Sequence, residues 1–191
     1  DILFGLQQAA DAALPAFYER QGKQAEDFIR TLIHRAEVSY EFIVFDIGTL
    51  IPVHIHRAIL RECTGLLVLS APTLPAIGPT TDGLNSMIVE GLIADNKNKA
   101  GLILNKYTKP RNLSVTDFQE LIGIKLLGVI PAVSTRVLHD LTNEGVFYLE
   151  AYLNGRFPEE LEPIFKEVLK IAEFFSPGAV KNAEDHFGIG R

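Results

Sequence analysis

The stretch AGLILNKYTKP, residues 100–110, decides the fold. Its aliphatic run ends abruptly at Asn105, Lys106 and Tyr107, and further along the chain KLLGVIPAV, residues 125–133, ends its own apolar run at Pro131. A nearly continuous apolar run of strand length is typical of a strand covered on both faces. The two runs therefore predict core strands that both end in residues suited to contacts outside the core.

Further apolar runs and the helical patterns between them extend this prediction to the whole chain. EFIVFDI (Glu41–Ile47) and GLLVLSA (Gly65–Ala71) also have the length and composition of buried strands, and DILFGL at the start is a weaker candidate. Amphipathic stretches alternate with these runs, namely residues 24–39, 80–95, 114–123, 134–145 and 159–175. Alternating strands and helices predict an α/β fold: a doubly wound, mostly parallel sheet with helices on both faces.

The domain organisation follows from the positions of these elements. We expect one α/β domain over 1–191, with an irregular lead-in over 1–24 and a C-terminal helix and tail over 158–191. Within it, Ser114, Asp117 and Gly123 are placed to cap the two ends of one helix. Met87 is the one methionine and the sequence begins at Asp1, so we expect a fragment of a longer protein.

Composition narrows the class of protein. The chain is 47% hydrophobic with a formal net charge of −6, which gives no strong signal for nucleic-acid binding. One cysteine, Cys63, rules out an internal disulfide framework and fits a reducing compartment, so we expect a cytoplasmic protein. No apolar run has the length of a membrane span, so we expect no integral membrane segment.

In parallel sheets ligands bind beyond the carboxyl ends of the strands, so the residues at those ends are the candidate site. Asp46 ends an apolar run, where a carboxylate could hold Mg²⁺ through water or orient an attacking water. The alternative is a helix cap or a hydrogen bond that orders a loop. Gly48 either permits close approach of a ligand to the backbone or only makes a turn.

Two further strand ends supply the other candidates. The amide of Asn105 can both donate and accept, as reading a purine edge requires, and the stem of Lys106 can lie against a ring. Pro131, Ala132 and Val133 follow the neighbouring strand. The alternative is a polar strand end in water.

One aromatic cluster lies outside these strand ends. VFYLEAYLNG, residues 146–155, carries Phe147, Tyr148 and Tyr152, which we interpret as core residues. The alternative is an oligomer contact.

Taken in order, the strand ends resemble the later two-thirds of a MinD/ParA-type ATPase. The resemblance covers roughly residues 28–145 and rests on YEFIVFDIG, LRECTGLLVLSAPTLPAIGPTTDGLNSMI, AGLILNKYTKP and IGIKLLGVIPAVSTRVLHDLTNEG. It implies binding of ATP or ADP with Mg²⁺. It also implies that Asp46 is the switch II aspartate, that Asn105 faces the adenine, and that Pro131 begins the loop on the base side.

Two motifs of that family are absent from this sequence. No lysine-rich phosphate-binding loop of the type K-G-G-x-G-K-[ST] is present, and Gly22-Lys23 is followed by glutamine. The switch II pattern D-x-P-A-G is replaced by DIGTL, residues 46–50. We therefore expect the phosphate-binding loop in an upstream segment of the parent protein, and a diverged branch such as the pilus-assembly localisers (CpaE/TadZ-type).

Three functions remain open from the sequence. The first is a positioning or switch ATPase that forms a homodimer around ATP and binds a protein partner at a cell pole, pilus, flagellum or partition complex. The second is a non-hydrolysing docking module with the same fold. The third is a biosynthetic enzyme resembling dethiobiotin or cobyrinate synthases, although FDIGTLIP lacks the acid-Gly-Gly run of those enzymes.

Overall fold

A computed structural model describes residues 15–48, 54–93, 99–108 and 113–176. Its contacts divide the chain into two compact units, Asp1–Thr64 with Gly83–Asn96, and Gly65–Asp82 with Lys97–Arg191. The second unit contains the sheet. The expectation of one α/β domain stays a prediction.

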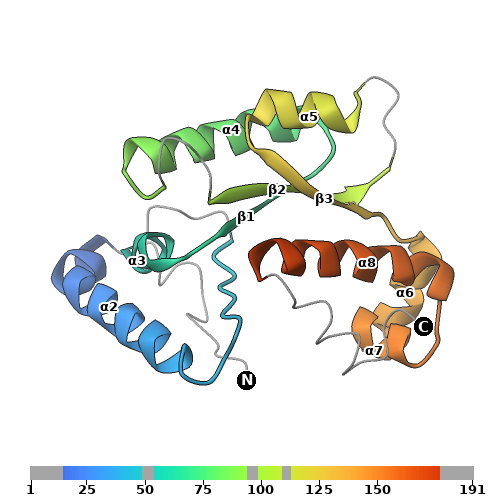
Figure 1. The fold of residues 1–191 in the computed structure, drawn as a ribbon, viewed down its shortest axis with the longest axis horizontal. Coiled ribbons are helices and arrows are strands. Elements are labelled where there is room, and N and C mark those ends of the chain that lie inside the picture. The colour runs from blue at the N-terminus through green and yellow to red at the C-terminus, as the bar shows by residue number, and fades with distance from the viewer. Residues whose placement is uncertain (1–14, 49–53, 94–98, 109–112, 177–191) are drawn as a thin grey trace. The chain divides into compact units, whose positions relative to one another are not determined.

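The sheet has three parallel strands in the order β1-β2-β3 (Figure 1). They are β1 (Leu66–Ser70), β2 (Ala100–Tyr107) and β3 (Lys125–Pro131), three of the strands that the sequence predicted. Strand β2 is central, and its first five residues are all buried. This agrees with the prediction that the run beginning at Ala100 is covered on both faces.

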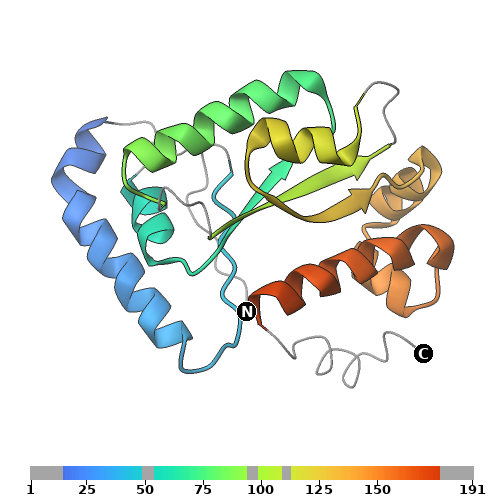
Figure 2. The same ribbon diagram turned by 45° about the horizontal axis from the view of Figure 1, so that its top comes forward.

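Helices cover the two faces of this sheet, as Figures 1 and 2 show for α5 (Val115–Ile122) and α8 (Pro158–Phe175). On α5, Phe118 and Ile122 are buried. On α8, Ile171 packs so closely against Gly128 of β3 that a Cβ there would lie 3.0 Å from the Ile171 Cδ1 atom. The layered α/β fold with helices on both faces is therefore confirmed.

Two backbone N–H groups of β3 donate to side chains of these helices instead of to β2. The N–H of Leu126 donates to Gln119 Oε1 at 2.9 Å, and the N–H of Val129 donates to Glu167 Oε2 at 3.2 Å. An edge strand with satisfied N–H groups offers a poorer template for pairing with another chain. These bonds also fix β3 against α5 and α8.

A small helical cluster follows β3. Helices α6 (Thr135–Glu144), α7 (Tyr148–Leu153) and α8 share a core of buried Val137, Leu141, Ala151, Leu161 and Ile164. Tyr148 and Tyr152 pack against this core, as predicted, and Tyr152 stacks on Phe165 with ring centroids 4.8 Å apart. Phe147 does not: its side chain is 80% exposed. The core interpretation is therefore correct for the two tyrosines and wrong for Phe147.

The other unit is built on α2 (Pro15–Ala36) and α3 (His54–Glu62). Ile29, Ala58 and Ile59 form its buried cluster. Two ion pairs join the helices, Arg30 to Glu62 at 3.1 Å and Arg61 to Glu26 at 2.9 Å. Exposed pairs of this kind contribute little each, so the apolar cluster is the larger stabilising term. Helix α4 (Leu74–Val89) belongs in part to each unit.

Glu41–Ile47 is not a strand, which corrects the sequence prediction. Its apolar side chains differ in their surroundings. Phe45 and Ile47 pack against the cluster of α2 and α3. Phe42 and Val44 are exposed. An apolar run indicates that a segment can be buried on both sides. Whether it forms a strand depends on pairing with segments far away in the sequence. DILFGL, the weaker strand candidate, lies outside the described residues.

Two helices begin earlier than predicted. Helix α2 starts at Pro15 and continues through Gly22, within the expected irregular lead-in, because proline suits a first helical turn and one internal glycine costs only about 1 kcal/mol. Helix α4 starts at Leu74 and runs through Pro79. Thr80 and Thr81 are therefore inside the helix, where their hydroxyls donate to the carbonyls of residues 76 and 77 instead of capping an end.

The predicted caps of α5 are confirmed. The N–H of Ser114 donates to Asp117 Oδ2 at 2.6 Å, the N–H of Asp117 donates to Ser114 Oγ at 3.2 Å, and Gly123 ends the helix with φ 75°. The bond from the Ser114 backbone, followed by that from its side chain, lowers the pKa of Asp117. A capping box thus fixes where this helix begins.

Asp117→Asn is expected to remove part of the acid sensitivity of the fold. Because the folded pKa of Asp117 is depressed, its contribution is present above the unfolded pKa and is lost as pH falls through the folded pKa. The wild type should exceed the variant in unfolding free energy above about pH 5. The gap should begin to narrow below about pH 4 and be lost only as pH falls through the lowered folded pKa. Urea denaturation at several pH values measures this, with Glu120→Gln on the same helix as the control. A gap that does not change with pH would contradict it.

Candidate functional site

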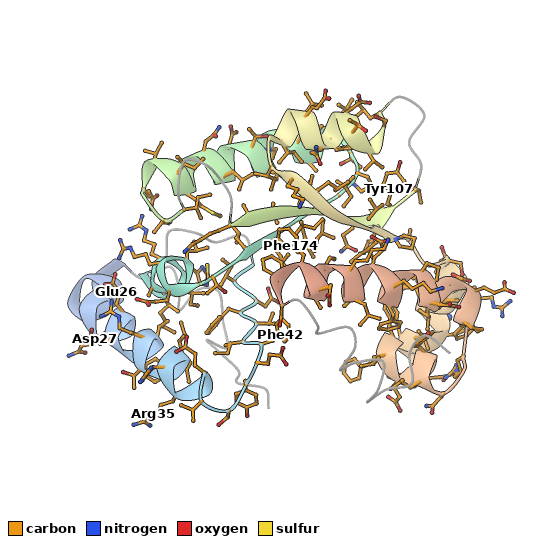
Figure 3. The ribbon with its side chains drawn as sticks, viewed as in Figure 1. Glu26, Asp27, Arg35, Phe42, Tyr107 and Phe174 are labelled. Carbon is orange, nitrogen blue, oxygen red and sulfur yellow. The ribbon has the colours of Figure 1, made fainter. Side chains whose placement is uncertain are left out.

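The ends of β2 and β3 lie side by side. Tyr107 is paired with Pro131 across the two strands, and the N–H of Ala132 donates to the Tyr107 carbonyl at 3.1 Å. Tyr107 is labelled at the end of β2 in Figure 3. The structure therefore brings together two of the segments that the sequence singled out, Asn105–Tyr107 and Pro131–Val133.

Lys106 gives the end of β2 an unusual shape. Its φ is 56°, in the left-handed region that non-glycine residues rarely adopt, and the register with β3 shifts between Leu104 and Tyr107. For a lysine this conformation costs about 1–2 kcal/mol. Such strain persists only where surrounding structure enforces it, and it is concentrated at functional sites. Asn105 is half-buried and the Lys106 side chain is exposed.

The loop after β3 has one buried and one open side. Val133, together with Ile130, packs against the core of α6, α7 and α8. Ala132, between Pro131 and Val133, is exposed. The loop is thus anchored by an apolar side chain while its middle residue faces outward.

Strand β1 adds a buried hydroxyl at the carboxyl ends of the strands. Ser70, the last residue of β1, is paired with Leu104, directly before Asn105, and is only 4% exposed. Its Oγ lies 3.3 Å from Thr80 Oγ1 and 3.3 Å from the Ala71 carbonyl oxygen. The hydroxyl therefore joins β1 to α4.

Asp46 and Gly48 belong to the other unit. Asp46 is exposed, and its Oδ1 accepts a hydrogen bond from the N–H of Gly48 at 3.2 Å. Gly48 has φ 57°, and a Cβ there would meet nothing within 4 Å. Glycine thus suits position 48 because of its positive φ, and not because a side chain would lack room there. The hydrogen bond to Asp46 is the loop-ordering bond that the sequence analysis gave as the alternative. The roles of both residues at a nucleotide stay predictions.

Sequence reasoning missed the contacts that hold the loop after β3. Ser134 is the N-cap of α6, and both its N–H and its hydroxyl donate to the carboxylate of Glu160, at 2.6 and 2.9 Å. The position of Ser134 before a helical pattern gives a signal for a cap. Nothing in the sequence joins it to a glutamate 26 residues away.

Two searches over the described parts of the chain were negative. No group of three or more His, Cys, Asp or Glu side chains is arranged to hold a metal ion there. Among the helices in those parts, none has the length and apolarity needed to cross a membrane.

Comparison with solved structures finds a likeness to the crystal structure of a ParA family ATPase from Chlorobium tepidum TLS. The TM-score is 0.50 and the sequence identity 20%, and the match covers 59% of this chain and 45% of that one. No protein-family profile matches the chain. No curated protein matches it either.

This likeness shows the fold alone: over the matched part, the chain shares its α/β fold with that structure. At 20% identity it shows nothing finer, and the match spans less than half of the related structure. The closer resemblance to MinD or to the pilus-assembly branch stays a prediction.

Proposed function

We propose that the ends of β2 and β3 form the base-binding side of an adenine-nucleotide site in a ParA-type switch ATPase. The observation that carries the proposal is the juxtaposition of Asn105 and Pro131–Val133 at the carboxyl edge of a parallel sheet, next to the strained Lys106. This edge is where ligands bind in such folds. The ParA-type fold is the supporting finding.

The chemistry of these residues suits a purine. The amide of Asn105 can accept from the adenine amino group and donate to a ring nitrogen, while the Lys106 stem covers the ring. Because a free amide can rotate, discrimination against guanine would come from fixed backbone groups of Pro131–Val133. The half-buried position of Asn105 limits the freedom of its side chain.

The proposal for Asp46, which belongs to the other unit, rests on the resemblance alone. A lone exposed carboxylate such as Asp46 fits a Mg²⁺ ion held mainly by nucleotide phosphates and water. Bound Mg²⁺ would neutralise charge on those phosphates. The sequence contains no lysine-rich loop of the family's type for the phosphates. In the assembled protein we expect nucleotide-dependent dimerisation and release of a protein partner.

Adenosine tests the proposal because it has no phosphates and so does not need the missing loop. We expect the 191-residue chain to bind adenosine with a Kd of roughly 0.1–1 mM. Guanosine should bind about tenfold more weakly. Equilibrium dialysis with each nucleoside measures both. Absence of adenosine binding, or equal affinity for the two nucleosides, would contradict the proposal.

A docking module without nucleotide is the second candidate, and a specific observation favours it. Exposed apolar side chains lie on α6, on α7 and on the link between them: Leu138, Phe147, Leu149 and Leu153. A contiguous patch of exposed apolar side chains is typical of a protein-binding surface, and in this second candidate function these four would form one. The adenosine titration separates the two candidates, because a docking module would not distinguish the nucleosides.

A further inference from the structure

The carboxylate of Glu160 on α8 binds the end of the loop that follows β3. Glu160 lies in the first turn of α8, and both of its oxygens accept hydrogen bonds from Ser134. The Ser134 N–H donates to Oε2 at 2.6 Å, and the Ser134 hydroxyl donates to Oε1 at 2.9 Å. Hydrogen bonds to an ionised group are roughly twice as strong as neutral ones.

Ser134 marks the end of the candidate base-side loop. Its Oγ also accepts from the Val137 N–H at 3.3 Å, so the same residue begins α6. At the other end of the loop, the Ala132 N–H is bound to the Tyr107 carbonyl of β2. Pro131–Val133 is therefore fixed between β2 on one side and Glu160 on the other.

A second glutamate of α8 places this helix relative to β3. Glu167 lies seven residues after Glu160, on the same face of the helix, and accepts from the Val129 N–H at 3.2 Å. Buried Leu161, Ile164 and Ile171 hold α8 in place. Of the carboxylates on this helix, that of Glu167 thus binds the strand and that of Glu160 binds the end of the loop.

We propose that Glu160 is a positioning residue that holds Pro131–Val133 in the geometry that receives the base. This inference rests on the proposed function. A loop that is already ordered loses less conformational entropy when a ligand binds, so the clamp raises affinity without touching the ligand. Glu167 has no such role, because the N–H that it binds belongs to the strand β3 and not to the loop after it.

Hydrogen exchange tests the clamp without any ligand. In Glu160→Gln a neutral amide replaces the carboxylate. The amide oxygen can still accept from the Ser134 N–H, but the bond loses its charge assistance and is about half as strong. Exchange of the Ser134 N–H, followed by NMR, should become about tenfold faster. Glu159→Gln, with the same change of charge in the same helical turn, should leave it unchanged. Equal exchange in Glu160→Gln and wild type would overturn the clamp.

Adenosine affinity then tests the positioning role. Glu160→Gln should weaken adenosine binding by about threefold to tenfold, and Glu167→Gln should not, although it makes the same change from a charged to a neutral acceptor in a bond between α8 and β3. Equal weakening by both variants would show a merely structural role and would overturn the proposal. If the wild type binds no adenosine, the proposed function fails, and the positioning role fails with it. The exchange of Ser134 would still decide whether the clamp exists.

Glu160→Asp keeps both readouts available if Glu160→Gln does not fold. It retains the charge but shortens the reach by one methylene group. We expect faster Ser134 exchange and weaker adenosine binding than in the wild type. Wild-type values of both in a folded Glu160→Asp would overturn the proposal.

Discussion

Replacing Phe118 by alanine should lower the free energy of unfolding by about 3–5 kcal/mol, the largest loss of stability that we expect from a single substitution here. Phe118 is 0% exposed and lies on α5, which covers one face of the sheet (Figure 2). Truncation removes its buried surface and leaves a cavity that the packed surroundings fill only in part. Urea denaturation followed by circular dichroism measures the loss.

Leu121→Ala is the matched control for that prediction. Leu121 lies on the same helix but is 50% exposed, so its truncation should cost less than about 1 kcal/mol. Similar losses for the two variants would mean that α5 does not pack on the sheet through Phe118.

Asn105→Ala should lower the affinity for adenosine at least about tenfold, the largest functional effect that we expect. In the proposed site Asn105 would pair with the purine edge, and the variant removes its side chain. Lys106 and Pro131 keep their identity in this variant, so only the amide side chain is lost. Because Asn105 is only half-buried, we expect little change in the free energy of unfolding. Isothermal titration calorimetry of the folded variant measures the affinity.

Asn143→Ala provides a control of the same chemistry. Asn143 is exposed on α6, and its amide contacts His139. Its removal should leave adenosine affinity unchanged. If Asn105→Ala binds adenosine as tightly as Asn143→Ala does, Asn105 does not read the base.

The strands that the sequence predicted correctly are those whose local pattern agrees with their surroundings. AGLILNKY is apolar along both faces and is the central strand, and KLLGVIP lies between helices that cover it. The capping signals at Ser114 and Gly123 were equally reliable, because a cap is a local interaction. EFIVFDI has the same composition but does not form a strand, since pairing needs a partner that the run itself cannot specify.

The candidate site was predictable in its location and not in its details. Parallel topology alone brings Asn105 and Pro131 to one edge of the sheet. The left-handed Lys106 had no signal, because lysine carries none of the conformational preference of glycine. The contact of Glu160 with Ser134 joins residues 26 positions apart and arises from the packing of α8. Such contacts depend on the tertiary structure.

The most direct test of the central claim is an NMR titration of the ¹⁵N-labelled chain with adenosine. We expect saturable shifts of the backbone amides at the paired strand ends, with α5 unaffected; the amides are those of Asn105, Lys106, Tyr107, Ala132 and Val133. These are the residues at the paired ends of β2 and β3. Shifts confined to other elements, or none at millimolar adenosine, would contradict the claim that this edge of the sheet binds the base.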